Sequence, residues 1–89
     1  MSPMATATTP WGKATLVEEV ALRQRAGERH FSSAVQLLEL PSGELLVRFA
    51  YASEGRPRRG PVTLRGRDLE RLRAALDRQP RLREALMGS

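Results

Sequence analysis

The 89-residue chain contains no cysteine, and this absence excludes several kinds of site. Without thiols the protein has no disulfide framework, no thiolate nucleophile and none of the usual structural zinc sites. The single histidine, His30, has no second histidine or carboxylate at ligand spacing, so we expect neither a metal site nor acid–base catalysis there. The chain also lacks a nucleophile–base pair, a carboxylate dyad and a glycine-rich phosphate cradle. We therefore expect a protein that is not an enzyme and uses no cofactor.

Long apolar runs are missing as well. No stretch of about 18 apolar residues is present, and the first residues lack the basic and apolar regions of a signal peptide. We expect a soluble cytoplasmic protein without a membrane partner or a small-molecule substrate. A domain of this length hides only about 60% of the surface that its unfolded chain exposes, so we expect oligomerisation to support the small core.

Lysine is nearly absent, and the basic residues, almost all arginine, are unevenly placed. Residues 55–83 contain ten arginines and three acidic residues, a net charge of +7, whereas the whole chain carries +5. Clustered guanidinium groups release counterions from nucleic-acid phosphates and attract polyanions over a long range. The charge placement therefore favours a nucleic-acid partner, although a codon bias towards arginine would also enrich this residue.

The N-terminal part of the chain has two regions. Residues 1–12 mix Ser, Thr, Ala and Pro without periodicity, which predicts a flexible arm, and residues 13–88 form a single domain. The stretch after the arm fits either a helix, with Thr15 and Glu18 as a capping box, or a strand. Leu16, Val20 and Leu22 fall on one side at a period of two, and we favour the strand for residues 15–26.

Two β-rich runs surround Pro41-Ser42-Gly43-Glu44 and predict a hairpin in which Gly43 takes a positive φ. We predict that Leu40 pairs with Leu45. Both faces of the hairpin are then partly apolar, and we expect a second subunit to cover one of them. This register places Ala34, Gln36, Leu38, Leu40, Leu45, Val47, Phe49 and Tyr51 on one face and Val35, Leu37, Leu46, Arg48, Ala50 and Ala52 on the other.

The spacing of the apolar residues changes in the C-terminal third of the chain, from a strand period to a helix period. Residues 61–65 predict a short fourth strand that begins at Pro61, and the leucines at 69, 72 and 76 then form a helix stripe. Pro80 predicts a kink or break near Gln79, followed by a short helix that points Leu82 and Leu86 inward. The expected fold is α+β, a four-stranded antiparallel sheet followed by a C-terminal helix that is kinked near Pro80, in the order β-β-β-β-α.

This order resembles the positive cofactor four family of transcriptional coactivators and their small bacterial relatives, over roughly residues 16–86. The hairpin "LELPSGELLVRFAY" is similar to the second and third strands of that family, and "GRPRRGPVTLRGRDLERLRAAL" to its basic loop, short strand and helix entry. Gly60, Thr63 and Leu64 occupy the family's Lys/Arg-Gly-Ile-Ser-Leu segment. The chain departs from the family at Ala50 and Ala52, where family members carry basic and aromatic groups.

The resemblance implies a homodimer with a curved sheet that binds single-stranded or melted DNA with little sequence preference. It implies helices at the subunit interface, and the leucines that we expect there are Leu72, Leu76, Leu82 and Leu86. Guanidinium groups on a glycine-rich and proline-rich loop suit phosphate contacts, although charged loops often only keep a protein soluble. The nucleic-acid-binding residues that we predict are Arg48, Arg56, Arg58, Arg59 and Arg65.

Other arginines have less specific patterns. Arg67, Arg71 and Arg78 lie nearly opposite the leucine stripe, where an ordinary solvated helix face explains them. Arg23, Arg25 and Arg29 cluster near the first hairpin candidate. The function that we predict is non-enzymatic binding of single-stranded DNA or RNA by a homodimer during transcription, replication or repair. The alternative is a protein interaction or oligomerisation module whose arginines serve solubility or an acidic protein partner.

Overall fold

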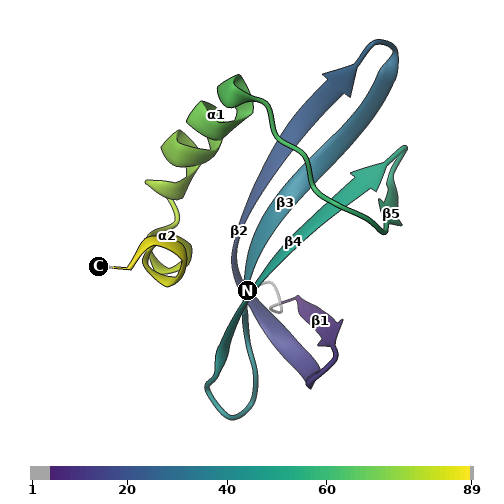
Figure 1. Ribbon diagram of the computed structural model, residues 1–89. Coiled ribbons are helices and arrows are strands. Elements are labelled where there is room, and N and C mark those ends of the chain that lie inside the picture. Colours follow the sequence, from purple (N-terminus) through teal and green to yellow (C-terminus); the bar gives the residue numbers. More distant parts are fainter. Residues whose placement is uncertain (1–4, 89) are drawn as a thin grey trace.

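The computed structural model describes residues 5–88 and shows an α+β chain with a curled antiparallel sheet and two helices (Figure 1). The five strands lie in sequence order across the sheet, so each strand pairs with the next one along the chain. The elements are β1 (Thr6–Thr9), β2 (Gly12–Ala26), β3 (Arg29–Glu39), β4 (Leu45–Ser53), β5 (Arg56–Arg58), α1 (Gly66–Leu76) and α2 (Pro80–Met87).

The α+β class is confirmed, and the expected count of four strands is wrong. The strand predicted for residues 15–26 is present as part of β2. Thr6–Thr9, which we expected to lie in a flexible arm, instead form β1 and pair with residues 12–15 of β2. Residues 1–4, which also belong to the predicted arm, lie outside the described residues.

The predicted basic loop contains a strand, and the predicted fourth strand is irregular. Arg56–Arg58 form β5 on the edge of β4, after a two-residue turn in which Glu54 and Gly55 both have positive φ, 55° and 76°. This backbone matches the twist of a tight hairpin. Residues 61–65, predicted as a strand, have no regular structure and run from β5 to α1 (Figure 1). Pro61 has no N–H to donate to a ladder, which agrees with this irregular path.

The β3–β4 hairpin is present, but its register is one residue away from our prediction. Glu39 pairs with Leu45, and Leu40 N–H donates to the carbonyl of Glu44 at 2.9 Å. The loop is therefore the three residues 41–43, and Gly43 has the expected positive φ, 93°. A one-residue shift moves every side chain of one strand to the other face. Val35 and Leu37 consequently pair with Phe49 and Val47 and share a face with them. The predicted register had put these two pairs of residues on opposite faces.

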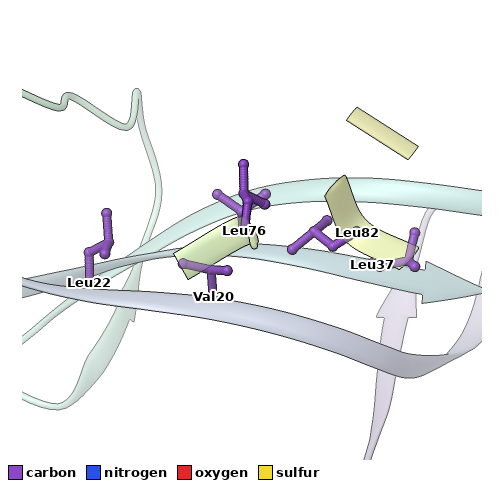
Figure 2. Packing of buried hydrophobic residues seen from close by; sticks show 6 residues of the cluster. Val20, Leu22, Leu37, Leu76 and Leu82 are labelled. Atoms are coloured by element: carbon purple, nitrogen blue, oxygen red, sulfur yellow. The ribbon is translucent and has the colours of Figure 1, made fainter. Parts of the chain in front are cut away.

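The main core lies between one face of the sheet and the two helices (Figure 2). Side chains from the sheet and from both helices pack together there, and Leu64 of the segment before α1 packs against them. Apolar groups from separate layers are removed from water together, which is the main source of stability in a domain of this kind. The buried members of this cluster are Val20, Leu22, Val35, Leu37, Leu76 and Leu82.

A second buried cluster lies on the opposite face, towards the β1 end of the sheet. Ala14, Leu38 and Leu40 are buried there, and Ala7 of β1 packs against them. A register shift between Leu16 and Glu18 marks a bulge in β2, and bulges increase the local twist of a strand. The cover that we expected from a second subunit is thus supplied at this end by β1 of the same chain.

The predicted interruption at Pro80 is confirmed, since α1 ends at Leu76 and α2 begins at Pro80. The carboxylate of Glu18, in β2, accepts a hydrogen bond of 2.7 Å from the backbone N–H of Leu82. This contact satisfies one of the free N–H groups in the first turn of α2 and ties the helix to the sheet. The described helices include none that is long and apolar enough to cross a membrane.

The leucines predicted for a dimer interface face the sheet of their own chain. Leu76 and Leu82 are buried in the main core, and Leu72 and Leu86 pack partly buried against it. Leu76 and Leu82 are therefore not available to a second copy in this conformation.

We expect Leu82→Ala to lower the free energy of unfolding by about 2–5 kcal/mol, because Leu82 is 0% exposed and its loss leaves a cavity. The matched control is Met87→Ala on the same helix. Met87 is 70% exposed, so its replacement should change stability by less than about 0.5 kcal/mol. Urea unfolding of both variants measures the difference, and equal midpoints would contradict the packing of α2 described above.

Deletion of residues 1–11 should remove β1 and expose the second cluster of Ala14, Leu38 and Leu40. We expect the melting temperature to fall by at least about 4 °C, the shift that 1 kcal/mol produces in a domain of this size. Circular dichroism on heating measures it. An unchanged melting temperature would show that β1 contributes nothing to the fold.

Candidate nucleic-acid interface

The five predicted binding arginines do not form one group. Arg48 lies on β4 in a row with Gln36 and Glu19, on the face opposite the helices. Its Nε donates to the side-chain oxygen of Gln36 at 2.8 Å and its Nη1 to the carbonyl of Thr8 at 3.3 Å. The structure therefore separates Arg48 from Arg65, which is the N-cap residue of α1 on the other side of the sheet.

Arg56 and Arg58 lie on β5, and Arg59 follows it directly. All three are exposed. The hydroxyl of Tyr51 donates to the carbonyl of Arg59 at 3.0 Å, which fixes the chain where it leaves the sheet edge. The β4–β5 register places Arg56 and Arg58 opposite Ser53 and Tyr51, on the sheet face that the helices cover elsewhere. These arginines thus form a short, ordered basic edge rather than a mobile loop.

A larger group of arginines lines an open cavity where the start of α1 lies beside β2. An open cavity of about 630 Å³ lies between the tip of the β2–β3 hairpin, the segment before α1 and the first turns of that helix. We call it the arginine cavity. Its lining residues are Arg23, Gln24, Arg25, Ala26, His30, Phe31, Thr63, Arg65, Arg67, Asp68 and Arg71.

Among the residues that the structure describes, Asp68 supplies the only carboxylate that lines the arginine cavity, and this carboxylate already accepts hydrogen bonds. It accepts hydrogen bonds from the backbone N–H of Arg65 at 3.1 Å and from Gln24 Nε2 at 3.0 Å. Its other oxygen accepts from Arg71 Nη1 at 3.1 Å. Within residues 5–88, Arg71 is the one cavity arginine that forms an ion pair. The cavity therefore carries an excess of positive charge.

The hydrogen bonds of Asp68 also determine its protonation. The backbone N–H of Arg65 lowers the pKa of this carboxyl below its ordinary value of 3.8, against the opposing effect of burial, and Gln24 and Arg71 lower it further. Asp68 is consequently ionised at neutral pH. An ionised carboxylate at the third residue of a helix is also favoured by the helix dipole.

Aromatic side chains lie next to the arginine cavity. A second hollow of about 260 Å³ shares Ala26, Phe31 and Thr63 with it and adds Tyr51 on its other side. Phe31 is half-buried and therefore presents part of its ring at the boundary between the two hollows. Guanidinium groups bind phosphates in bidentate geometry, and aromatic rings stack on unpaired bases. The combined surface offers both kinds of contact side by side.

Sequence reasoning identified Arg65 and missed most of its neighbours. Arg67 and Arg71 are exposed, as a solvated helix face requires, yet they line the cavity because α1 lies beside β2. Arg71 Nη1 donates to the backbone carbonyl of Arg23 at 3.0 Å, which joins the helix directly to that strand. For the strand side of the cavity, the clustering of Arg23 and Arg25 was the one signal in the sequence.

Comparison of the chain with protein-family models, with curated proteins and with solved structures gave no match. The resemblance to the positive cofactor four family therefore stays a prediction. Among the described residues, no group of three or more His, Cys, Asp or Glu side chains could hold a metal ion.

The lowered pKa of Asp68 predicts how stability depends on pH. A carboxyl whose pKa is lower in the folded state than in the unfolded state stabilises the fold above the unfolded pKa, and this contribution disappears as pH falls through the folded pKa. We expect Asp68→Asn to melt below the wild type at pH 7, and this gap to shrink as the pH falls below about 4. Thermal unfolding from pH 7 to 2 measures the gap. A gap that is constant over this range would contradict the role assigned to the ionised carboxylate.

Proposed function

We propose that this protein binds single-stranded nucleic acid without catalysing a reaction, and that the arginine cavity is the main binding surface. The single observation that carries the proposal is the convergence of five arginines, two from β2 and three from residues 65–71, around one carboxylate that is already hydrogen-bonded. A polyanion relieves the repulsion among these cations and releases its own counterions when it binds.

The neighbouring aromatic surface supports a single strand over a duplex. Base pairs in a duplex stack on each other and leave their flat faces inaccessible to a protein ring. An unpaired base can stack on Phe31 or Tyr51 while the adjacent phosphates contact the arginines of the cavity. These contacts read no base edge, so we propose binding to DNA or RNA with little sequence preference.

Arg56, Arg58 and Arg59 provide a second group of phosphate contacts in this proposal. They are exposed beside Tyr51, and the segment from Pro61 to Arg65 joins them to the arginine cavity along the chain. A strand that crosses the aromatic hollow would meet cations at both ends. Arg48 has no place in this surface, because it lies on the opposite face with Gln36 and Thr8.

The test is fluorescence anisotropy with a labelled oligothymidine strand, titrated over a series of salt concentrations. We expect the triple variant Arg23→Ala, Arg65→Ala, Arg67→Ala to bind more weakly and to lose about 2 from the slope of log affinity against log salt, since each phosphate contact contributes about 0.7. The matched control is Arg73→Ala, Arg78→Ala, Arg81→Ala. It removes the same charge from exposed helical and interhelical positions outside the cavity.

Equal slopes for the two triple variants would show that net charge, and not the arginine cavity, holds the strand. A labelled duplex of the same length should bind more weakly than the single strand at equal salt. If the wild type binds no oligonucleotide at low salt, the proposal is rejected, and the protein-interaction alternative takes its place. Melting curves for each variant confirm that the fold is intact.

A further inference from the structure

Ser53, the last residue of β4, lines the aromatic hollow, the space of about 260 Å³ beside the arginine cavity. It is 6% exposed, and its hydroxyl forms no hydrogen bond with the residues that the structure describes. No fully buried side-chain oxygen or nitrogen among these residues lacks a partner, so the hydroxyl of Ser53 reaches the hollow. A polar group that is buried to this extent usually has a partner, and a ligand in the hollow would supply one.

The floor of the aromatic hollow consists of two cross-strand pairs of β3 and β4. Phe31 pairs with Ser53. Ser33 pairs with Tyr51, so an aromatic ring and a hydroxyl alternate along each strand. The hydroxyl of Ser33 donates to the side-chain oxygen of Gln24, which leaves its lone pairs free to accept, whereas that of Ser53 can donate and accept. The floor therefore offers a hydrogen-bond donor and acceptors beside two flat rings.

The segment between β5 and α1 crosses this part of the sheet and is held at both ends (Figure 1). At one end the hydroxyl of Tyr51 donates to the carbonyl of Arg59 at 3.0 Å. At the other end Gln24 Nε2 donates to the carbonyl of Thr63 at 3.2 Å. Pro61 and Thr63 line the hollow from this segment. The hollow is thus formed before a ligand arrives, which lowers the entropy cost of binding.

We propose that the aromatic hollow is a pocket for one unpaired nucleobase. This site rests on the proposed binding of a single strand and adds where one base enters. The ring of the base stacks on Phe31 or Tyr51, and its polar edge meets the two serines. An N–H of the base donates to the hydroxyl of Ser33, and a carbonyl oxygen or ring nitrogen accepts from that of Ser53. The adjacent phosphate lies towards the arginine cavity, which shares Phe31 with the hollow.

A nucleobase fits this chemistry better than an apolar group or a phosphate does. An apolar group would leave the hydroxyl of Ser53 without a partner, and a phosphate has no flat face for the rings. Each of the four bases carries a donor and an acceptor on its pairing edge, so the two hydroxyls serve all of them and the low sequence preference is kept. In a duplex this edge is occupied by the other strand, so only an unpaired base enters the pocket.

Strands with almost no bases measure this pocket apart from the phosphate contacts. The probes are a labelled strand of abasic residues and the same strand with a single thymine at its centre. Both carry the same phosphates, so the ratio of their affinities at equal salt reports one base. We expect the thymine to raise the affinity of the wild type at least about fivefold, the low end of what one base–aromatic stack contributes.

Two variants with matched controls assign this gain to the hollow. Phe31→Ala should abolish most of it, whereas Phe49→Ala should not change it, because Phe49 is an exposed ring on the same face that does not line the hollow. Ser53→Ala should lower the gain at least about twofold through one lost hydrogen bond. It should not lower the melting temperature, since no bond within the protein is lost. Its control is Ser32→Ala, on the opposite face of β3.

Equal affinity of the wild type for the two strands would overturn the pocket and leave the phosphate contacts of the proposed function in place. A gain that Phe31→Ala and Phe49→Ala lower equally, or that Ser53→Ala and Ser32→Ala lower equally, would also overturn it.

Thymidine, which has no phosphate, separates this pocket from the strand-binding function. In an NMR titration at millimolar concentration it should shift the backbone amides of Ser33, Ser53 and Thr63, and deoxyribose, which has no base, should not. If neither strand binds at low salt, the strand-binding function is rejected, and these shifts alone decide the pocket. Equal shifts with thymidine and deoxyribose would overturn it, and shifts with thymidine only would support it.

Discussion

The place of the first helix on the sheet depends on the buried carboxylate of Asp68. It receives hydrogen bonds from a side chain of β2, from the backbone before α1 and from an arginine within α1. Gln24, the β2 partner, also donates to the carbonyl of Thr63 and accepts from the hydroxyl of Ser33. β2 and the start of α1 therefore meet at one charge, and an ionised group is stable there because each of its oxygens has a donor. The arginines around this point are held in position by the same contacts.

The parts of the fold that follow from local rules were predictable. Pro80 cannot continue a helix and Gly43 can adopt a positive φ, so the helix break and the β3–β4 turn follow from single residues. The register of that hairpin was not predictable, because Pro41-Ser42-Gly43 fits a three-residue loop and a four-residue loop equally well in sequence. β5 was missed for a related reason. Its turn places Glu54 at a positive φ, which glutamate rarely adopts, so no local preference marks the turn.

The site was less predictable than the fold, because its residues are distant in the sequence. Arg23 and Arg71 come together only when α1 lies beside β2, and the orientation of that helix depends on Leu76, Leu82 and the Asp68 contacts. On a helix wheel an arginine that lines a cavity and an arginine in open solvent look the same, since both lie opposite the leucines. Charge placement predicted a polyanion partner, but it gave no information on which arginines share a surface.

The two edges of the sheet have different chemistry. Beyond its pairing with β1, the β2 edge lies beside α1 and carries the arginine cavity, whereas the β4 edge is open and apolar up to β5. β3 separates the two edges. The aromatic hollow lies next to the arginine cavity and is lined by Tyr51 of β4. In the proposed binding mode a nucleic-acid strand therefore lies along the helix side of the sheet, between the arginine cavity and β5, and the opposite face with Arg48 takes no part in it.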